Sequence, residues 1–170
     1  LQQCRSEILA DLASSHIPGG AVRARTIEGF LKQETIDFES IWRHLRLVSC
    51  WTDGPSSGYI SEIKKRLPHA EIQGKGLVAT EAFVSFPLLE GRDPVLAVES
   101  HFFEFQDSET GMIHFAHQLT EGRTYSVIVT TGGGLYRYAL GDLVQATGFI
   151  EQTPVLRFIC REDVSDYFGE

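Results

Sequence analysis

The sequence contains no asparagine and only three cysteines, and both shortages bear on where the protein works. Without asparagine there is no acceptor for N-linked sugars. Cys4, Cys50 and Cys160 lie far apart and form no Cys-x-x-Cys pair, so they indicate neither a disulfide framework nor a zinc motif. An odd number of scattered thiols is typical of a reducing compartment, and we expect a cytoplasmic protein.

Long apolar runs and an excess of basic charge are also missing. No run approaches the roughly 20 apolar residues that a helix needs to span a bilayer, and the formal net charge is −8. The one basic cluster, Lys64-Lys65-Arg66, falls at the end of a predicted helix, where it is solvated. We therefore expect no membrane-embedded segment and no nucleic-acid partner.

Several common catalytic motifs are absent as well. There is no GxxxxGK[ST] loop, no GxSxG elbow and no HExxH helix, so the glycine triplet Gly132–Gly134 is not a phosphate loop of the P-loop kind. His114 and His117 are three residues apart in a predicted strand and therefore face opposite sides. We expect them to be ordinary sheet histidines and not the ligands of a metal ion.

The first half of the chain alternates predicted helices and strands. The apolar run 45–51 predicts a buried strand, 58–67 a helix closed by Pro68, and 70–73 and 77–79 further strand. This order is a βαβ unit, and ligands of such sheets gather at the carboxyl ends of the strands. We expect Trp51–Gly54 and Ala79–Glu81 to share one rim. Scaffold helices are predicted before this unit, at 1–17, 26–32 and 37–45, with Pro18-Gly19-Gly20 ending the first.

The second half consists of short β-branched and aromatic runs separated by turns, which predicts an antiparallel, partly closed sheet. The fold class is therefore α/β, with an α/β portion at 1–90 and a β-rich portion at 91–170. The expected boundary is the turn Glu90–Pro94. The predicted strands are 95–98, 102–105, 113–117, 125–130, 135–139, 143–149 and 155–160.

The stretch from Gly132 to Arg161 holds the most distinctive residues. Alternation predicts that Leu135, Arg137 and Ala139 lie on one face of a strand. Gly141 then lets the backbone bend, and Asp142 is presented at the break. A carboxylate fixed there can accept hydrogen bonds from both hydroxyls of a sugar. The alternative is an aspartate that bonds its own backbone in a β-turn.

Two segments resemble the auxin-responsive acyl acid amido synthetases of plants and their bacterial relatives, which belong to the adenylate-forming enzymes. The segments are Gly134-Leu135-Tyr136-Arg137-Tyr138-Ala139-Leu140-Gly141-Asp142 and Phe158-Ile159-Cys160-Arg161. The resemblance extends over most of the chain from about Ile41. It implies part of an adenylate-forming amino-terminal domain.

The resemblance also implies roles for single residues. Asp142 would hold the ribose of ATP, and Arg161 would contact ribose or phosphate; the alternative for Arg161 is a surface ion pair with Glu162 or Asp163. Thr80-Glu81 matches a Ser/Thr-Glu pair that faces ATP, so that Thr80 would contact phosphate and Glu81 would hold Mg²⁺. The alternative for this pair is a helix N-terminus, with Thr80 as the cap.

Further assignments rest on position within the family. Thr52 and Gly54 correspond to a glycine-containing loop that lines the adenine pocket, although an ordinary strand-to-helix loop fits the same residues. Asp163 falls where these enzymes hinge toward a carboxy-terminal lid. The family's phosphate loop and lid lysine have no match in the 170 residues, so we expect this chain alone not to turn over.

The activity implied is ATP-dependent adenylation of a small carboxylic acid followed by transfer to an amine, which in this family is often an amino acid. Ala139 and Leu77 stand where plant members usually have arginine and tyrosine, and the resemblance therefore does not specify the acid or the amine. An acyl-CoA ligase would share the nucleotide residues and differ in its acceptor. A non-catalytic binding module would keep the sheet without nucleotide affinity.

Overall fold

The computed structural model describes residues 4–14, 18–32, 36–88 and 93–162. The chain divides into two compact units. The first comprises Leu1–Leu47 and Ser61–Glu71, and the second comprises Val48–Ile60 and Ile72–Glu170. The turn expected to separate residues 1–90 from 91–170 falls largely on 89–92, outside the described residues.

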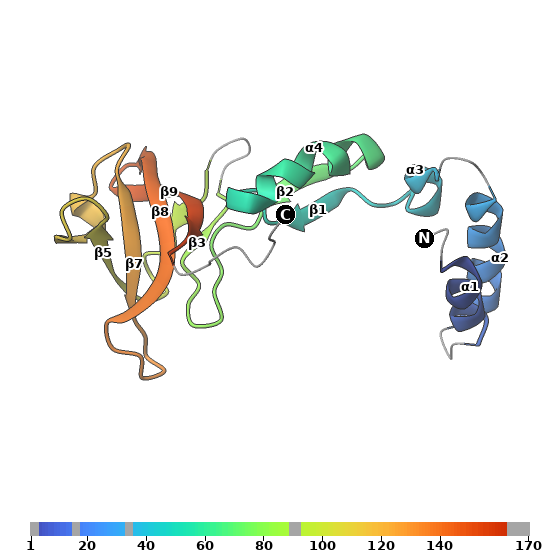
Figure 1. The fold of residues 1–170 in the computed structure, drawn as a ribbon, viewed down its shortest axis with the longest axis horizontal. Coiled ribbons are helices and arrows are strands. Elements are labelled where there is room, and N and C mark those ends of the chain that lie inside the picture. Colours follow the sequence, from blue (N-terminus) through green and yellow to red (C-terminus); the bar gives the residue numbers. More distant parts are fainter. Residues whose placement is uncertain (1–3, 15–17, 33–35, 89–92, 163–170) are drawn as a thin grey trace. The chain divides into compact units, whose positions relative to one another are not determined.

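Helices α1 (Arg5–Ser14), α2 (Gly20–Leu31) and the short α3 (Phe38–Ile41) belong to the first unit (Figure 1). We expected Pro18-Gly19-Gly20 to end one helix and a second helix to begin at Thr26, but α2 begins at Gly20. The reason is that Gly19 adopts φ 82° and ends the turn by itself, which leaves Gly20 free to start the helix. α3 is capped by Asp37, whose side chain accepts from the Ser40 N–H at 3.2 Å.

The predicted βαβ unit is confirmed in its order. Strand β1 (Leu47–Cys50) is followed by η1 (Gly54–Ser56), α4 (Ser57–Arg66) and β2 (Glu71–Gly74), and β1 and β2 form a two-stranded sheet. The Glu71 N–H bonds the Arg46 carbonyl at 2.8 Å and the Lys75 N–H bonds the Cys50 carbonyl at 3.0 Å. Since both numbers rise together, the strands are parallel, as expected.

The second unit is dominated by an antiparallel sheet of seven strands in the order β3-β4-β9-β8-β7-β5-β6 (Figure 1). The antiparallel sheet predicted for the second half is thereby confirmed. The strands are β3 (Ser85–Phe86), β4 (Val95–Leu96), β5 (Phe102–Asp107), β6 (Ile113–Phe115), β7 (Thr124–Thr130), β8 (Tyr138–Ile150) and β9 (Thr153–Arg161); η2 (Ala116–Gln118) follows β6.

Several predicted strand boundaries are wrong: β4 ends at Leu96 and not at 98, β6 ends at Phe115 and not at 117, and 135–139 is only partly strand. Residues 135–137 are not strand, and β8 instead runs unbroken from Tyr138 through Gly141 and Asp142. Arg137 leaves the extended conformation at φ 48° because tertiary contacts hold it there. Its N–H donates to the Thr130 hydroxyl at 3.0 Å and its Nε to the Glu104 carboxylate at 2.9 Å. Such contacts come from distant strands and leave no trace in local alternation.

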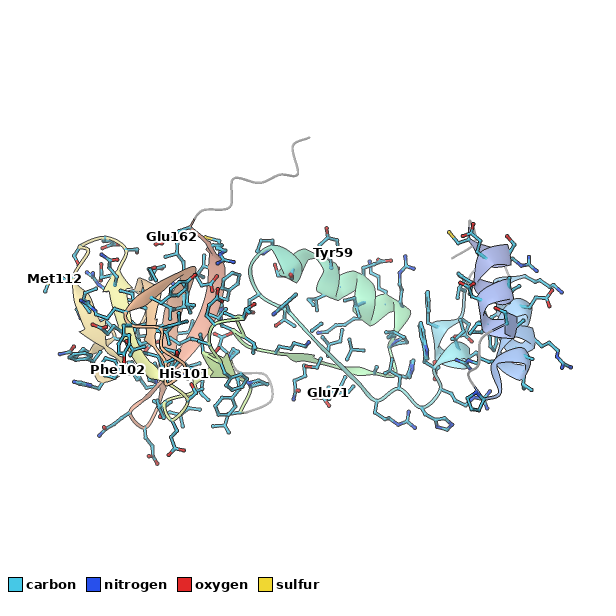
Figure 2. All side chains as sticks on the ribbon, turned by 90° about the horizontal axis from the view of Figure 1, so that it is seen from below. Tyr59, Glu71, His101, Phe102, Met112 and Glu162 are labelled. Carbon is cyan, nitrogen blue, oxygen red and sulfur yellow. The ribbon has the colours of Figure 1, made fainter. Side chains whose placement is uncertain are left out.

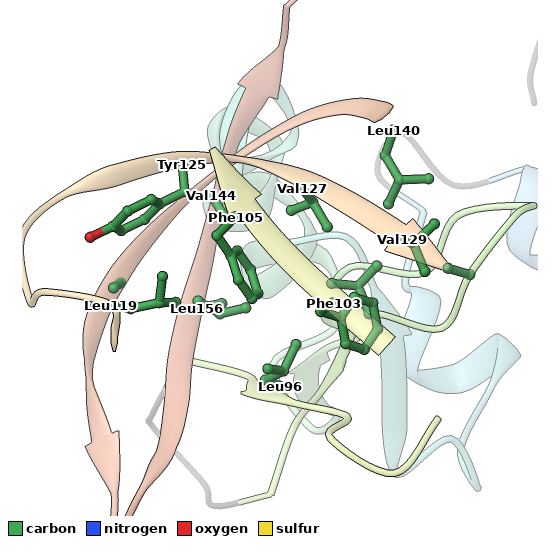
Figure 3. Close-up of a cluster of buried hydrophobic side chains, with 13 residues drawn as sticks. Leu96, Phe103, Phe105, Leu119, Tyr125, Val127, Val129, Leu140, Val144 and Leu156 are labelled. Atoms are coloured by element: carbon green, nitrogen blue, oxygen red, sulfur yellow. The ribbon is translucent and has the colours of Figure 1, made fainter. Parts of the chain in front are cut away.

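The core lies on one face of this sheet (Figure 3). Phe105, Tyr125, Val127 and Val144 have no exposed surface, and Ala79 packs against the cluster from outside the sheet. Phe102 of β5 points away from the core and is exposed to solvent. Met112, in the β5–β6 turn, is exposed as well (Figure 2). The core therefore includes side chains of β7 and β8, and the segment that precedes β3 packs against it.

A buried carboxylate fixes the β5–β6 turn and gives the fold a pH-dependent element. Asp107 accepts from the N–H groups of Glu109 and Thr110, each at 2.9 Å, and from Arg123 at 2.7 Å. The Thr110 N–H, followed by the Arg123 guanidinium, holds the pKa of Asp107 well below its usual range.

We therefore expect Asp107→Asn to lower the urea midpoint at pH 7. A folded-state pKa below the unfolded value of about 3.9 stabilises the fold above that pH, and the effect disappears as the pH falls through the folded-state value. The difference between wild type and variant should shrink below pH 4. Glu109→Gln is the matched control, because Glu109 is exposed and lies 3.7 Å from Arg123; an equal loss there would contradict the assignment.

Candidate functional site

A cavity of about 450 Å³ lies within the second unit, where four separate stretches of chain meet. The loop after β1 and the segment after β2 form two walls, and the strands β8 and β9 supply the rest. The lining residues are Trp51, Thr52, Asp53, Ser56, Gly76, Leu77, Val78, Ala79, Thr80, Glu81, Asp142, Phe158 and Arg161. The shared rim expected for 51–54 and 79–81 is confirmed for residues 51–53 and 79–81, which line the cavity together.

Thr80 and Glu81 occupy a tight turn and not the start of a helix. Val78 pairs with Phe83 in an antiparallel bridge, and the Ala79 N–H bonds the Ala82 carbonyl at 2.9 Å. No helix begins anywhere in residues 80–88, so the N-cap alternative is wrong. The turn projects Thr80 and Glu81 toward the cavity, while Ala79 and Ala82 beside them pack on the core.

Asp142 lies inside β8, directly opposite Arg161 of β9, and not at the chain break we expected. The expected bend at Gly141 is present, since its φ is 73°, but this bend is a local irregularity within β8 and does not end the strand. The Arg161 Nε lies 4.0 Å from the Asp142 carboxylate, and its Nη2 donates to the Leu140 carbonyl at 3.2 Å. Glu162, the residue after β9 (Figure 2), continues the pairing through its N–H, which donates to the Gly141 carbonyl.

The Asp142 carboxylate is poorly solvated and incompletely paired. Its residue is 7% exposed, and in the described part of the chain no hydrogen bond reaches its oxygens. Burial raises the pKa of Asp142, the charge of Glu81 adds to that rise, and Arg161 opposes it. Glu81 and Asp142 therefore influence each other across one cavity, and both retain oxygens that can accept hydrogen bonds from a ligand.

Gly54 brings the loop after β1 against β9. Its φ is 55°, and a Cβ on it would lie 2.7 Å from the Ile159 carbonyl oxygen and 3.0 Å from the Phe158 ring. We predicted that this glycine lines the pocket, but it is not among the lining residues. Its role is indirect: because Gly54 lets the loop backbone approach β9 closely, the neighbouring Thr52 and Asp53 line the cavity together with Phe158.

Asp53 is the acidic lining residue that sequence reasoning missed. Burial raises the pKa of Asp53, and Asp93 raises it further; Arg157 lowers it, and so do the Thr52 hydroxyl and the Phe158 N–H. The signal was available, since Asp53 stands between the two residues predicted to lie near the base. It was not recognised because Asp is frequent in strand-to-helix loops.

Thr52, which we predicted to line a pocket, is one of the residues that line the cavity. Its hydroxyl packs over Gly74. Asp163, the predicted hinge residue, lies outside the described residues. Among those that are described, no group of three His, Cys, Asp or Glu side chains converges as a metal site, and no helix is long and apolar enough to cross a membrane.

The lining combines aromatic and charged side chains. Trp51 and Phe158 supply aromatic surface, and Asp53 lies two residues after Trp51 in the lining loop. Asp142 and Glu81 supply carboxylates, and Arg161 lies beside Asp142. Three carboxylates against one guanidinium favour ligand groups that donate hydrogen bonds, such as sugar hydroxyls and base N–H groups. Phosphate groups would need an added cation.

Comparison with known proteins finds a family model that matches the sheet region. Residues 94–161, less than half of the chain, match the family model of the GH3 family central domain. This segment is similar to that domain. It contains β4 to β9, including Asp142, Phe158 and Arg161. The resemblance drawn from 134–142 and 158–161 is thereby confirmed.

Relatives extend the likeness beyond the GH3 domain. A probable indole-3-acetic acid-amido synthetase of Oryza sativa subsp. japonica, GH3.6, is 29% identical over 145 residues, which are 76% of this chain and 30% of that protein. The jasmonoyl–L-amino acid synthetase JAR4 of Nicotiana attenuata is 42% identical over 69 residues, 37% of this chain and 12% of that protein.

A solved structure shows the same fold. The GH3.15 acyl acid amido synthetase superposes with a TM-score of 0.78 at 20% identity, over 96% of this chain and 34% of that one. The predicted fold class is confirmed by this match. The chain spans about a third of the length of the relatives and structures it resembles.

Proposed function

We propose that this chain forms the nucleotide-binding part of an ATP-dependent ligase that adenylates a carboxylic acid and transfers the acyl group to an amine. The supporting observation is that Glu81 and Asp142, far apart in sequence, open onto one cavity together with Thr80 and Arg161. The relatives support the reaction class, since one is named an amido synthetase and another an L-amino acid synthetase. The same names support an amine acceptor in place of a thiol.

The reaction has two balanced steps. An oxygen of the acid's carboxylate attacks the α-phosphorus of ATP, the bond to the β-phosphate breaks, and pyrophosphate leaves. The amine nitrogen then attacks the acyl carbon, AMP leaves with the anhydride oxygen, and the nitrogen loses a proton. The acid and the amine are proposed to be small molecules, with an amino acid as one class of amine.

Within this scheme the chain's residues bind and orient. Asp142 accepts hydrogen bonds from the ribose hydroxyls, and Arg161 donates to ribose or phosphate oxygens. The Thr80 hydroxyl donates to a phosphate oxygen from the turn beside Glu81. Because Asp142 is buried and lacks a close hydrogen bond, a ribose would satisfy oxygens that the protein leaves unpaired.

Glu81 fits a magnesium ion only in company with phosphate. Mg²⁺ takes oxygen ligands and is commonly held by one or two carboxylates plus phosphate oxygens and water. Glu81 supplies one such carboxylate at the cavity edge, next to the hydroxyl of Thr80. When bound, the ion would offset phosphate charge that the three cavity carboxylates otherwise repel.

Titration calorimetry on this chain tests the proposal with AMP and with ATP plus Mg²⁺. Both should bind, and Glu81→Gln should weaken ATP with Mg²⁺ roughly tenfold, the value of one charge-assisted contact, while leaving AMP unchanged. Glu71→Gln is the control, because Glu71 of β2 is exposed (Figure 2) and does not line the cavity. Absence of binding by either nucleotide at millimolar concentration would refute the function.

A further inference from the structure

The turn that carries Thr80 and Glu81 joins two arms that are anchored differently. The arm before the turn, residues 77–79, lines the cavity together with the turn itself, and we call it the cavity arm. The arm after the turn, residues 82–86, runs into β3 and contributes Val84, which has no exposed surface, to the core; we call it the core arm. The place of Thr80 and Glu81 in the cavity therefore depends on how the cavity arm is held.

The core arm is fixed by the sheet. The Ala97 N–H donates to the Val84 carbonyl at 2.8 Å, and the Ser100 hydroxyl donates to the Phe83 carbonyl at 2.8 Å. The end of the arm forms the ladder between β3 and β4. All these partners follow the turn in the chain, so the core arm keeps its position without help from the cavity arm.

The cavity arm is tied to the core arm at both of its ends. Near the turn, the Ala79 N–H donates to the Ala82 carbonyl at 2.9 Å. At the far end, the Leu77 carbonyl accepts from the N–H groups of Val84 and Ser85, each at 3.0 Å. The Leu77 N–H donates in turn to the Ser85 hydroxyl at 2.9 Å. Leu77 and Ala79 also pack on the core, but both are only partly buried. The hydroxyl of Ser85 thus adds a side-chain tie between the arms.

The burial of Ser85 indicates that its hydroxyl serves this tie. Ser85 is 1% exposed, at a position of β3 where an apolar side chain would avoid the cost of burying a polar group. Its backbone lies so close to the start of the cavity arm that a Cβ on Gly76 would be 2.5 Å from the Ser85 carbonyl oxygen. Because Ser85 does not line the cavity, any effect of its hydroxyl on a ligand must pass through the cavity arm.

We infer that Ser85 is a positioning residue, whose hydroxyl sets the cavity arm and thereby the direction in which Thr80 and Glu81 meet the phosphates of the nucleotide. This inference rests on the proposed function, because it takes these two residues to act on the triphosphate and its metal ion. Loss of the hydroxyl leaves the Leu77 N–H without its partner, which loosens the cavity arm while the core arm stays in place. The effect is then confined to ligands that carry phosphate.

Calorimetry with adenosine and with ATP plus Mg²⁺ separates positioning from general stability. Ser85→Ala should weaken ATP with Mg²⁺ roughly three- to tenfold, the range of one neutral hydrogen bond, and leave adenosine unchanged. In a Thr80→Ala/Glu81→Gln background, Ser85→Ala should have no further effect, because the groups that it positions are already gone. Ser100→Ala is the matched control: it removes a hydroxyl that supports the core arm, and both ligands should bind as they bind the wild type.

The outcomes distinguish this inference from the proposed function. If Glu81→Gln weakens ATP with Mg²⁺ but Ser85→Ala does not, the role of Ser85 is refuted and the function stands. The role is also refuted if Ser85→Ala weakens adenosine equally, if Ser100→Ala has the same effect, or if the loss persists in the double-variant background. If the wild type binds neither ligand, both proposals are refuted. Urea midpoints show whether each variant is folded. If Ser85→Ala is not, Ser85→Cys, which keeps the shape with a weaker acceptor, takes its place in the same comparison.

Discussion

Replacing Asp142 with alanine should lower the affinity for AMP roughly 10- to 100-fold. A hydrogen bond to a charged group contributes about 1.5–3 kcal/mol, and each 1.4 kcal/mol is a factor of ten. Asp142 is suited to contribute at this level because its carboxylate is buried and lies 4.0 Å from its nearest cation, Arg161. Calorimetry with AMP measures the change directly.

The ribose itself provides the control for this variant. AMP lacking the 2′ and 3′ hydroxyls should bind the wild-type chain as weakly as intact AMP binds Asp142→Ala, and the variant should not distinguish the two ligands. If the variant still prefers intact AMP by the wild-type factor, Asp142 does not hold the ribose. Arg161 would then be the remaining candidate for the ribose contact.

The same carboxylate should make the unliganded fold less stable. Burial raises the pKa of Asp142 above its unfolded value, so folding disfavours its charged form. The destabilisation is absent below about pH 4, grows as the pH rises through the folded-state pKa, and is complete above it. Asp142→Asn should therefore increase the free energy of unfolding at pH 7 by about 1 kcal/mol while weakening AMP. Unchanged stability would show that Arg161 fully offsets the burial.

Replacing Gly76 with alanine should destabilise the second unit by about 3 kcal/mol or more, from backbone strain and overpacking together. Gly76 adopts φ 78°, and a Cβ on it would lie 2.5 Å from the Ser85 carbonyl oxygen and 2.8 Å from its carbon. Both obstacles are backbone, so neither can rotate away. Ser85 is also tied to Leu77 by hydrogen bonds in both directions, at 2.9 and 3.0 Å.

Gly122→Ala is the matched control for this prediction. Gly122 has φ 87°, but nothing lies within 4 Å of the position a Cβ would take. Its replacement should therefore cost only the backbone term, about 1–2 kcal/mol. Urea denaturation with unchanged slope measures both losses. Equal losses at the two positions would show that the close approach of Gly76 to β3 is not what matters.

Sequence reasoning succeeded where a pattern is local. The run 45–51 predicted β1 and 102–105 predicted β5 because apolar composition marks a strand locally. The burial predicted for the first run is wrong, since no residue of β1 is buried. Sequence reasoning also failed at Gly141, where a glycine with positive φ was taken as the end of a strand. The structure shows that the ladder to β9 continues past it.

The sequence alone determined the order of the parallel unit and the antiparallel character of the sheet. It also singled out the acidic residues 81 and 142 as candidate site residues. Each of these inferences rests on residues that are close together in the chain. Tertiary structure decided that these acids share a cavity and that Asp53 joins them. The physical reason is that convergence depends on strand pairing and on the close approaches of Gly54 and Gly76 to distant backbone. Contacts of that kind lie between segments whose local patterns carry no information about each other.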